Sequence, residues 1–418
     1  MNLARTSVLS FIATAIRLLS GLVINKAIAI IIGPSGLALI GQFQNTQNMI
    51  RTFSQGGINA GVTKYTSECN SKGKSTLELW SASFKTTVFF SLIASLILII
   101  FSSELSIFVF KTDVYTYVFV LFGITLIFSA LNQLLLSILN GLKEIDSFIK
   151  INIFQSLFSL VFTTSYILIF GLDGAFIALV TNQSIIFLVI LWYLRKHPLI
   201  KFSSFFQGFN FGWTKKLTSY SLMALTSSIA VPCSQILIRD NIGQSLSWED
   251  AGYWQAMTYI STMYLLVVTT ALSTYYLPKL SEISGSRELK NELLEGYKYL
   301  LPIVATLTLI VYFCRAYIVE LLFTEDFMSM LVLFKWQLIG DFMKISSWLV
   351  AYVMLAKALT KIYIVSELVF SVLYVLLAQY FVSAYGLVGV SYAFAVNYFI
   401  YFICMVFVVS RYISGLDD

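Results

Sequence analysis

The chain has few charged residues, a single histidine and four widely spaced cysteines, and each shortage excludes a class of protein. Charged residues make up 11% of its 418 residues, whereas soluble domains carry roughly 25%. Without paired cysteines or a second histidine beside His197, the sequence offers no zinc site and no disulfide framework. It also shows no pairing of a nucleophile with a base. We therefore expect no metal, no cofactor and no enzymatic activity.

Apolar residues dominate instead. Hydrophobic residues are 58% of the chain and the mean hydropathy is +0.83, which is typical of an integral membrane protein. A run of about 20 apolar residues crosses the hydrocarbon of a bilayer as one helix. Such runs lie at 9–32, 37–61, 83–101, 115–139, 148–170, 175–194, 217–238, 254–277, 299–322, 330–355, 362–381 and 387–409. The sequence thus predicts an all-α integral membrane protein with twelve transmembrane helices.

Lysine and arginine are distributed unevenly between the two sets of connections that these helices create. The richer set includes the loops at 195–216 and 279–298. The poorer set holds only Lys111, Arg239, Arg315 and Lys335. The positive-inside rule therefore predicts that the rich loops and both termini are cytoplasmic. The net charge of +6 reflects this topology and contact with anionic lipids, so no nucleic-acid partner is expected.

Two short motifs recur along the chain at nearly one offset. The sequence Gly36-Leu37-Ala38 is matched by Gly252-Tyr253-Trp254, and Gly171-Leu172-Asp173-Gly174 is matched by Gly386-Leu387-Val388-Gly389. Two copies of a six-helix repeat enter the membrane from the same side, as a parallel repeat. We therefore expect six-helix lobes at 1–197 and 217–418, a cytoplasmic linker at 198–216, and a central cavity that opens by alternating access.

Charged residues inside the expected helices are the main candidates for function. They are Arg17, Lys26, Arg51, Asp341, Lys344 and Glu367. A charge at the centre of a bilayer costs roughly 2.5–3.5 kcal/mol on insertion scales, so these side chains should face a hydrated interior. Most of them are cations, which favours an anionic cargo.

A polar stripe follows the helix expected at 37–61. Gln44, Asn48, Arg51 and Gln55 share one helical face. The amides fit either substrate binding or hydrogen bonding between helices, whereas a guanidinium needs water, an acid or an anion. Arg17 is expected at a depth similar to that of Arg51, and two planar guanidiniums suit a pyrophosphate.

Two further positions each allow two interpretations. Lys26 lies half a turn away from Arg17 on a straight helix, so it joins the same site only if Gly21 permits a bend; otherwise it extends toward the membrane surface. Pro232 interrupts the helix at 217–238 and is either a hinge for the rocking motion or a tolerated kink.

The second half of the chain carries a possible coupling network. Asp341 and Lys344 are three residues apart on one helix and can pair, so they fit either a charge network in the cavity or a structural ion pair. Glu367 has no partner on its own helix. A carboxyl group in a membrane can take up a proton or bind Na⁺, so Glu367 is a candidate coupling site and equally a candidate partner of Lys344.

Several short motifs occur in order along the chain and carry a family resemblance. They are Gly33-Pro34-Ser35-Gly36-Leu37, Gly61-Val62-Thr63-Lys64-Tyr65, Tyr276-Leu277-Pro278, and Trp336-Gln337-Leu338 followed by Gly340-Asp341 and Lys344. Their order over residues 1 to 412 resembles that of Wzx-type polysaccharide flippases, in the branch of the O-antigen translocases and the lipid III flippases of enterobacterial common antigen.

The resemblance implies the fold of the multidrug/oligosaccharidyl-lipid/polysaccharide exporter superfamily and a place in the bacterial inner membrane. The implied cargo is an undecaprenyl-pyrophosphate-linked oligosaccharide, moved from the cytoplasmic to the periplasmic leaflet for O-antigen lipopolysaccharide or common-antigen synthesis. By that analogy Arg17, Lys26 and Arg51 meet the pyrophosphate. The resemblance also implies membrane lipids, a polysaccharide polymerase and a chain-length regulator as partners.

Other functions remain open as alternatives. A drug or metabolite:cation antiporter of the same superfamily is the main one, although it should offer acids to its cargo and the first half has none inside its helices. A membrane polymerase or glycosyltransferase should show a long loop or a cluster of acids and arginines at one membrane face. An ion channel should show rings of like residues from several subunits.

Overall fold

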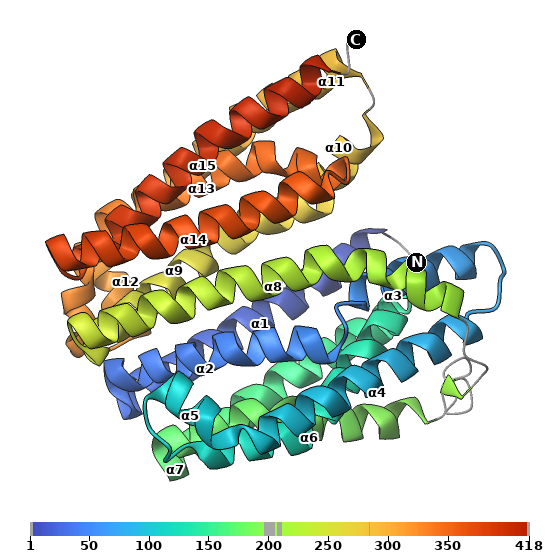
Figure 1. The fold of residues 1–418 in the computed structure, drawn as a ribbon, viewed down its shortest axis with the longest axis horizontal. Coiled ribbons are helices and arrows are strands. Elements are labelled where there is room, and N and C mark those ends of the chain that lie inside the picture. Colours follow the sequence, from blue (N-terminus) through green and yellow to red (C-terminus); the bar gives the residue numbers. More distant parts are fainter. Residues whose placement is uncertain (1–2, 196–204, 207–210, 284, 416–418) are drawn as a thin grey trace. The chain divides into compact units, whose positions relative to one another are not determined.

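The computed structural model describes residues 3–195, 205–206, 211–283 and 285–415, and within these ranges it shows helices and connecting turns but no strand (Figure 1). The chain divides by compactness into two units. Unit 1 comprises residues 1–32 and 39–232, and unit 2 comprises residues 33–38 and 233–418. The linker expected at 198–216 lies largely outside the described residues.

Unit 1 contains the helices of the first half of the chain. These are α1 (Leu3–Ile31), α2 (Gly33–Ser54, with its first residues in unit 2), α3 (Asn59–Ser71), α4 (Leu77–Ile100), α5 (Ser102–Phe110), α6 (Thr116–Gly141), α7 (Ile145–Leu194) and the first part of α8 (Phe211–Ser245). Helix α6 packs against α4 and α7, and α7 also packs against α1.

An aromatic cluster fixes α2 within this unit. The ring of Phe43 is fully buried and its centroid lies 5.5 to 6.1 Å from those of Phe110, Phe119, Phe122 and Phe176. These rings come from α5, α6 and α7. Aromatic pairs at this separation stabilise a packed core, so the cluster sets the position of the polar residues that follow on α2.

Unit 2 contains the rest of α8 and the remaining helices. These are α9 (Trp248–Ala271), the π-helical turn η2 (Leu272–Tyr276), α10 (Leu277–Glu282), α11 (Ser286–Phe313), α12 (Arg315–Leu322), the 3₁₀ segment η3 (Glu325–Leu333), α13 (Phe334–Ala356), α14 (Thr360–Tyr385) and α15 (Val388–Ser414). Helix α13 packs against α15 and α11. Ile345, Leu349 and Val353 of α13 form the core with Tyr401 and Met405 of α15.

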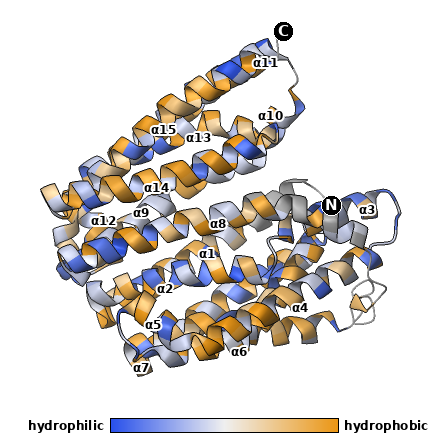
Figure 2. Cartoon of the chain, in the orientation of Figure 1, coloured by the Kyte–Doolittle hydropathy of each residue, from blue (hydrophilic) through white to orange (hydrophobic). Residues whose placement is uncertain are grey.

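Most of these helices are suited to a membrane. In the described ranges, 9 helices are long and apolar enough to cross one, by length and composition, and apolar residues run along them (Figure 2). One of the 9, α7, has 50 residues with a non-helical Gly171 inside, so it holds two expected spans. Helices α2 and α8 correspond to two further expected spans, which are not among these 9. The full count of twelve remains a prediction.

The backbone confirms the internal repeat. Gly171 and Gly386, which are 215 residues apart, have left-handed φ values of 57° and 66°. Lys143 and Ala358, separated by the same offset, have φ values of 59° and 53°. Non-glycine residues rarely adopt this conformation. Two unrelated positions therefore repeat an unusual backbone geometry in the same register.

The corner that follows each of these glycines is also repeated. A Cβ atom on Gly174 would lie 1.9 Å from the carbonyl oxygen of Tyr166, and one on Gly389 would lie 2.0 Å from that of Phe381. Both pairs keep the 215-residue offset. Only glycine allows two helices to approach so closely, so the Gly-x-x-Gly motif found in the sequence is the cause of both corners.

Candidate functional site

One carbonyl oxygen of α7 holds the polar face of α2 in unit 1. Gln47 Nε2 donates to the oxygen of Leu179 at 2.8 Å, and Arg51 Nη2 donates to the same oxygen at 3.1 Å. Arg51 Nε is buried and has no hydrogen-bond partner among the residues that the structure describes. Within the described residues no carboxylate forms an ion pair with Arg51. This half-buried guanidinium has an unused donor and no counter-charge, which suits it to an anion.

The helix ends directly after Arg51. Helix α2 stops at Ser54, and Gly56 and Gly57 have left-handed φ values of 64° and 63°. The N–H groups of the two glycines bond back to carbonyls in the last turn of α2, as in other glycine-terminated helices. The expectation of one continuous helix at 37–61 is therefore wrong. Arg51 lies in the last turn, where the negative end of the helix dipole favours a cation.

The second half is irregular at the corresponding place. The π-helical turn η2 begins at Leu272, which is 215 residues after Gly57. In transporters built from repeats, interrupted helices at matching positions of the two halves often mark a binding site. The interruption points to the end of α2, and so to Arg51, as the candidate site of unit 1.

Of the amide side chains in the predicted stripe on α2, two are free to bind a ligand and one is hydrogen-bonded within the protein. Gln44 is half-buried and Asn48 is exposed, and neither side-chain amide bonds to another described residue. Gln55 is buried, and its Oε1 accepts a hydrogen bond of 2.6 Å from Asn59 Nδ2. Gln44 and Asn48 are thus open to a ligand, whereas Gln55 bridges the break between α2 and α3.

The two cations of α1 do not share a face. Helix α1 is uninterrupted through Gly21, and nine residues separate Arg17 from Lys26, so their side chains point in opposite directions. Arg17 is exposed, and no described residue forms a hydrogen bond or ion pair with it, whereas Lys26 is half-buried and has a contact within the protein. The bend at Gly21 that would bring both to one site is not observed.

In unit 2, Asp341 of α13 is fully buried and bound by two hydroxyl groups of α9. Its Oδ2 accepts hydrogen bonds of 2.7 Å from Ser261 Oγ and 2.8 Å from Tyr264 Oη. Its Oδ1 has no hydrogen-bond partner in the described part of the chain. The sequence did not indicate Ser261 or Tyr264 as partners, because they are 80 and 77 residues away along the chain. A buried carboxyl group with one open oxygen can hold a proton or a small cation.

Lys344 lies against aromatic rings and forms no ion pair with Asp341. Its Nζ is 4.8 Å from the ring centroid of Trp348 and 5.8 Å from that of Tyr398, a geometry that stabilises a cation. The ion pair with Asp341 that the helical spacing allows is absent from the described residues, because the lysine extends toward these rings. Glu367 of α14 is half-buried, and its charge and that of Asp341 both act on Lys344. The three predicted charges are thus within electrostatic range of one another, although no ion pair joins them among the described residues.

Arg239 is a buried cation that the sequence did not indicate as an interior residue. The charge pattern assigns Arg239 to an outer connection, but α8 continues to Ser245 and leaves Arg239 only 1% exposed. Its guanidinium donates to Gln255 Oε1 and lies 5.3 Å from the ring centroid of Trp254. These partners on α9 explain why so polar a segment stays helical. The sequence around Arg239 does not indicate them, because they belong to another helix.

Pro232 lies inside α8. The boundary between units 1 and 2 follows it directly, at Cys233. Proline has no N–H, so the helix lacks one backbone hydrogen bond at this point. The boundary from Ala38 to Leu39 likewise falls inside a helix, α2. Both helices therefore continue from one unit into the other.

Comparisons with known proteins agree with this picture. The family described as "Polysaccharide biosynthesis protein" matches residues 28–332. The lipid III flippases of Escherichia coli (strain K12) and Shigella flexneri are each 28% identical over 414 residues, which is 98% of this chain and 99% of theirs.

Solved structures share the fold at low identity. An inward-facing multidrug resistance MATE family transporter of the MOP superfamily has a TM-score of 0.78 at 13% identity, over 96% of this chain and 95% of that one. A MOP superfamily transporter from Pyrococcus furiosus has a TM-score of 0.72 at 12% identity, over 99% and 96%. The superfamily fold expected from the sequence is confirmed.

Proposed function

Since this chain belongs to the polysaccharide biosynthesis protein family, we propose that it is a flippase for an oligosaccharide linked to polyprenyl pyrophosphate. The cargo is an O-antigen unit or lipid III, carried from the cytoplasmic to the periplasmic leaflet of the bacterial inner membrane by alternating access. The full-length similarity to two proteins named lipid III flippase supports this cargo. The uneven distribution of lysine and arginine supports cytoplasmic termini.

The observation that carries the proposal is the state of Arg51. Its Nε is buried without a hydrogen-bond partner, and no described carboxylate neutralises it. An unsatisfied guanidinium inside a membrane helix costs free energy unless a ligand completes it. A pyrophosphate oxygen supplies both the acceptor and the negative charge, and the resulting charge-assisted bond is among the stronger kinds.

The other polar residues of α1 and α2 have secondary roles in this proposal. Arg17, which is exposed, supplies a second guanidinium for the pyrophosphate. Gln44 and Asn48 bind sugar hydroxyl groups with their open amides, whereas Gln55 supports the break beside Arg51. Lys26 points away from Arg17, so it contributes to the positive potential and makes no direct contact with the phosphate.

The cluster of Asp341, Lys344 and Glu367 is the proposed coupling element. The open Oδ1 of Asp341 provides a place for a proton or Na⁺. A buried acid also suits a drug or metabolite:cation antiporter, which is the second candidate function. The two candidates differ at Arg51, because a cationic cargo has no use for an unpaired guanidinium.

Pro232 is the proposed hinge. Its position at a boundary between units 1 and 2 and the hydrogen bond that it removes from α8 support this role. A polysaccharide polymerase and a chain-length regulator are the proposed protein partners, because they would use the cargo on the periplasmic side.

Complementation tests the cargo. A bacterial strain without its own lipid III flippase should regain the surface polysaccharide when it expresses this chain, as measured by immunoblot. The Arg51→Ala variant should restore less than about a tenth of the wild-type amount, the loss expected for one charge-assisted hydrogen bond. Arg287→Ala, which removes an exposed arginine of α11, is the matched control and should restore the wild-type amount.

Membrane levels of all three proteins are measured by quantitative blotting, so that poor expression is not mistaken for loss of transport. Full complementation by Arg51→Ala at equal protein level would overturn the role of Arg51. No complementation by the wild-type chain, together with drug resistance conferred on the same strain, would favour the antiporter.

A further inference from the structure

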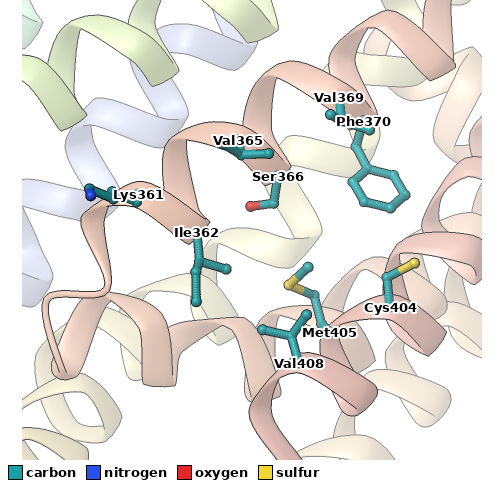
Figure 3. Close-up of a pocket in the computed structure, with 9 residues that line it drawn as sticks. All are labelled: Lys361, Ile362, Val365, Ser366, Val369, Phe370, Cys404, Met405 and Val408. Atoms are coloured by element: carbon teal, nitrogen blue, oxygen red, sulfur yellow. The ribbon is translucent and has the colours of Figure 1, made fainter. Parts of the chain in front are cut away.

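An apolar groove lies between α14 and α15 in unit 2. It has a volume of about 360 Å³, which is within the range of small-ligand sites. Ile362, Val365 and Val369 line it from α14, and Met405 and Val408 line it from α15 (Figure 3). The three α14 residues are 39%, 59% and 54% exposed, so the groove is open along α14.

Small side chains create this groove, and an aromatic pair closes it. Ser366 of α14 and Cys404 of α15 are both small and line it, so neither side chain fills the space (Figure 3). At the far end the ring of Phe370 meets that of Tyr401 at a centroid distance of 4.8 Å. The Ser366 hydroxyl donates to its own helix, to the oxygen of Tyr363 at 2.9 Å. The groove therefore offers hydrocarbon to its occupant and no free polar group.

A lysine that contacts no other described polar or aromatic group lies at the open end. Lys361 is exposed and makes no hydrogen bond, ion pair or ring contact with another described residue. Lys357, one turn earlier in the chain, instead donates to the carbonyl oxygens of Ser281 and Ile283. Arg411, one turn beyond Val408 on α15, is also exposed and lies over the ring of Phe407. The mouth of the groove is thus positively charged.

We infer that this groove holds one acyl chain of an anionic phospholipid, whose phosphate binds Lys361. Basic pockets between transmembrane helices bind such headgroups. From Lys361 to Phe370 the groove is about 13 Å long, which fits within one leaflet of a hydrocarbon core about 30 Å thick. Because the groove is open along α14, the rest of the acyl chain continues into the surrounding lipid. The site does not depend on what the protein transports.

Native mass spectrometry of the full chain tests this inference. The protein is extracted in mild detergent and offered equal amounts of phosphatidylglycerol and phosphatidylcholine with identical chains. Wild-type protein should retain phosphatidylglycerol preferentially. Lys361→Ala should reduce this preference about fivefold, the effect expected of one lysine beside an anionic surface. Lys290→Ala, an exposed lysine of α11, is the matched control and should keep the preference.

A second pair of variants tests the chain-binding part of the groove. Val365→Trp fills it and should lower the retention of both lipids, whereas Val372→Trp changes an equally exposed valine of α14 outside it and should not. Equal retention of the two lipids by wild-type protein, or an unchanged preference in Lys361→Ala, would overturn the inference. Displacement of phosphatidylglycerol by undecaprenyl phosphate at equal concentration would also overturn it, since the occupant would then be a polyprenyl chain.

Discussion

Gln47 and Arg51 donate to one and the same acceptor, the carbonyl oxygen of Leu179, at 2.8 and 3.1 Å. The shared oxygen uses one Nη of the guanidinium and leaves Nε buried and unpaired. Gln47 thus anchors α2 to α7 one turn before the arginine. Gln47 therefore holds α2 in place, whereas Arg51 is the candidate ligand-binding residue. Mutation of each residue tests these two roles separately.

The support can be tested at Gln47. Gln47→Ala removes the bond of 2.8 Å to Leu179 and should lower the free energy of unfolding by about 1 kcal/mol. It should also slow transport, because the guanidinium loses its fixed position. Gln44→Ala is the matched control for stability, since the Gln44 amide bonds to no described residue. Thermal unfolding of the two purified variants measures their stability. Equal melting temperatures would contradict the role of Gln47.

The two repeated corners should be equally intolerant of a methyl group. Gly174→Ala and Gly389→Ala place Cβ 1.9 and 2.0 Å from a carbonyl oxygen of the preceding helix, so each should cost about 3 kcal/mol or more and sharply reduce the folded yield. Gly415→Ala, where the nearest atoms are 3.6 Å away, should behave as the wild type. Size-exclusion profiles and melting temperatures decide the outcome. A stable Gly389→Ala protein would show that the second corner is not under the same constraint.

The role of Asp341 in transport should depend on its negative charge more than on the shape of its side chain. Asp341→Asn keeps an oxygen that accepts from Ser261 and Tyr264, so the protein should fold, but the side chain no longer ionises. Transport should then lose its dependence on an imposed proton or Na⁺ gradient. Glu367→Gln tests the other acid in the same assay. If the gradient dependence survives both substitutions in reconstituted vesicles, the cluster does not couple transport to an ion.

If Pro232 is a hinge, its replacement should slow transport without lowering the stability of the protein. Pro232→Ala restores the backbone N–H inside α8 and should leave the melting temperature unchanged or raised. Transport should nevertheless slow, because the helix bends less readily at the unit boundary. Pro302→Ala is the matched control, since this proline lies inside α11 and away from that boundary. A normal transport rate in Pro232→Ala would mean that the proline is a tolerated kink.

The global architecture was predictable from the sequence because it depends on periodic features. Long apolar runs determine the helices, and the 215-residue recurrence of Gly-x-x-Gly indicates the internal repeat that the backbone shows again at Gly171 and Gly386. The end of α2 was also visible in principle, as the consecutive glycines Gly56 and Gly57. The polar stripe through Gln55 favoured a longer helix and obscured that signal.

The site was less predictable because its partners are distant in the chain. Asp341 and Lys344 satisfy the spacing for a pair, yet tertiary contacts direct the acid to Ser261 and Tyr264 and the lysine to Tyr398. Arg239 has the local environment of a loop and becomes a buried residue only through α9. Spacing within one helix cannot identify a partner on another.

The most direct measurement is the rate at which a fluorescent undecaprenyl-pyrophosphate-linked saccharide crosses the bilayer of vesicles that contain the purified chain. Quenching by a membrane-impermeant reductant reports that rate. We predict that the wild-type protein accelerates crossing, that Arg51→Lys retains part of the acceleration because it keeps the charge, and that Arg51→Ala equals protein-free vesicles. Equal rates for Arg51→Ala and wild-type protein would contradict the claim that Arg51 binds the pyrophosphate.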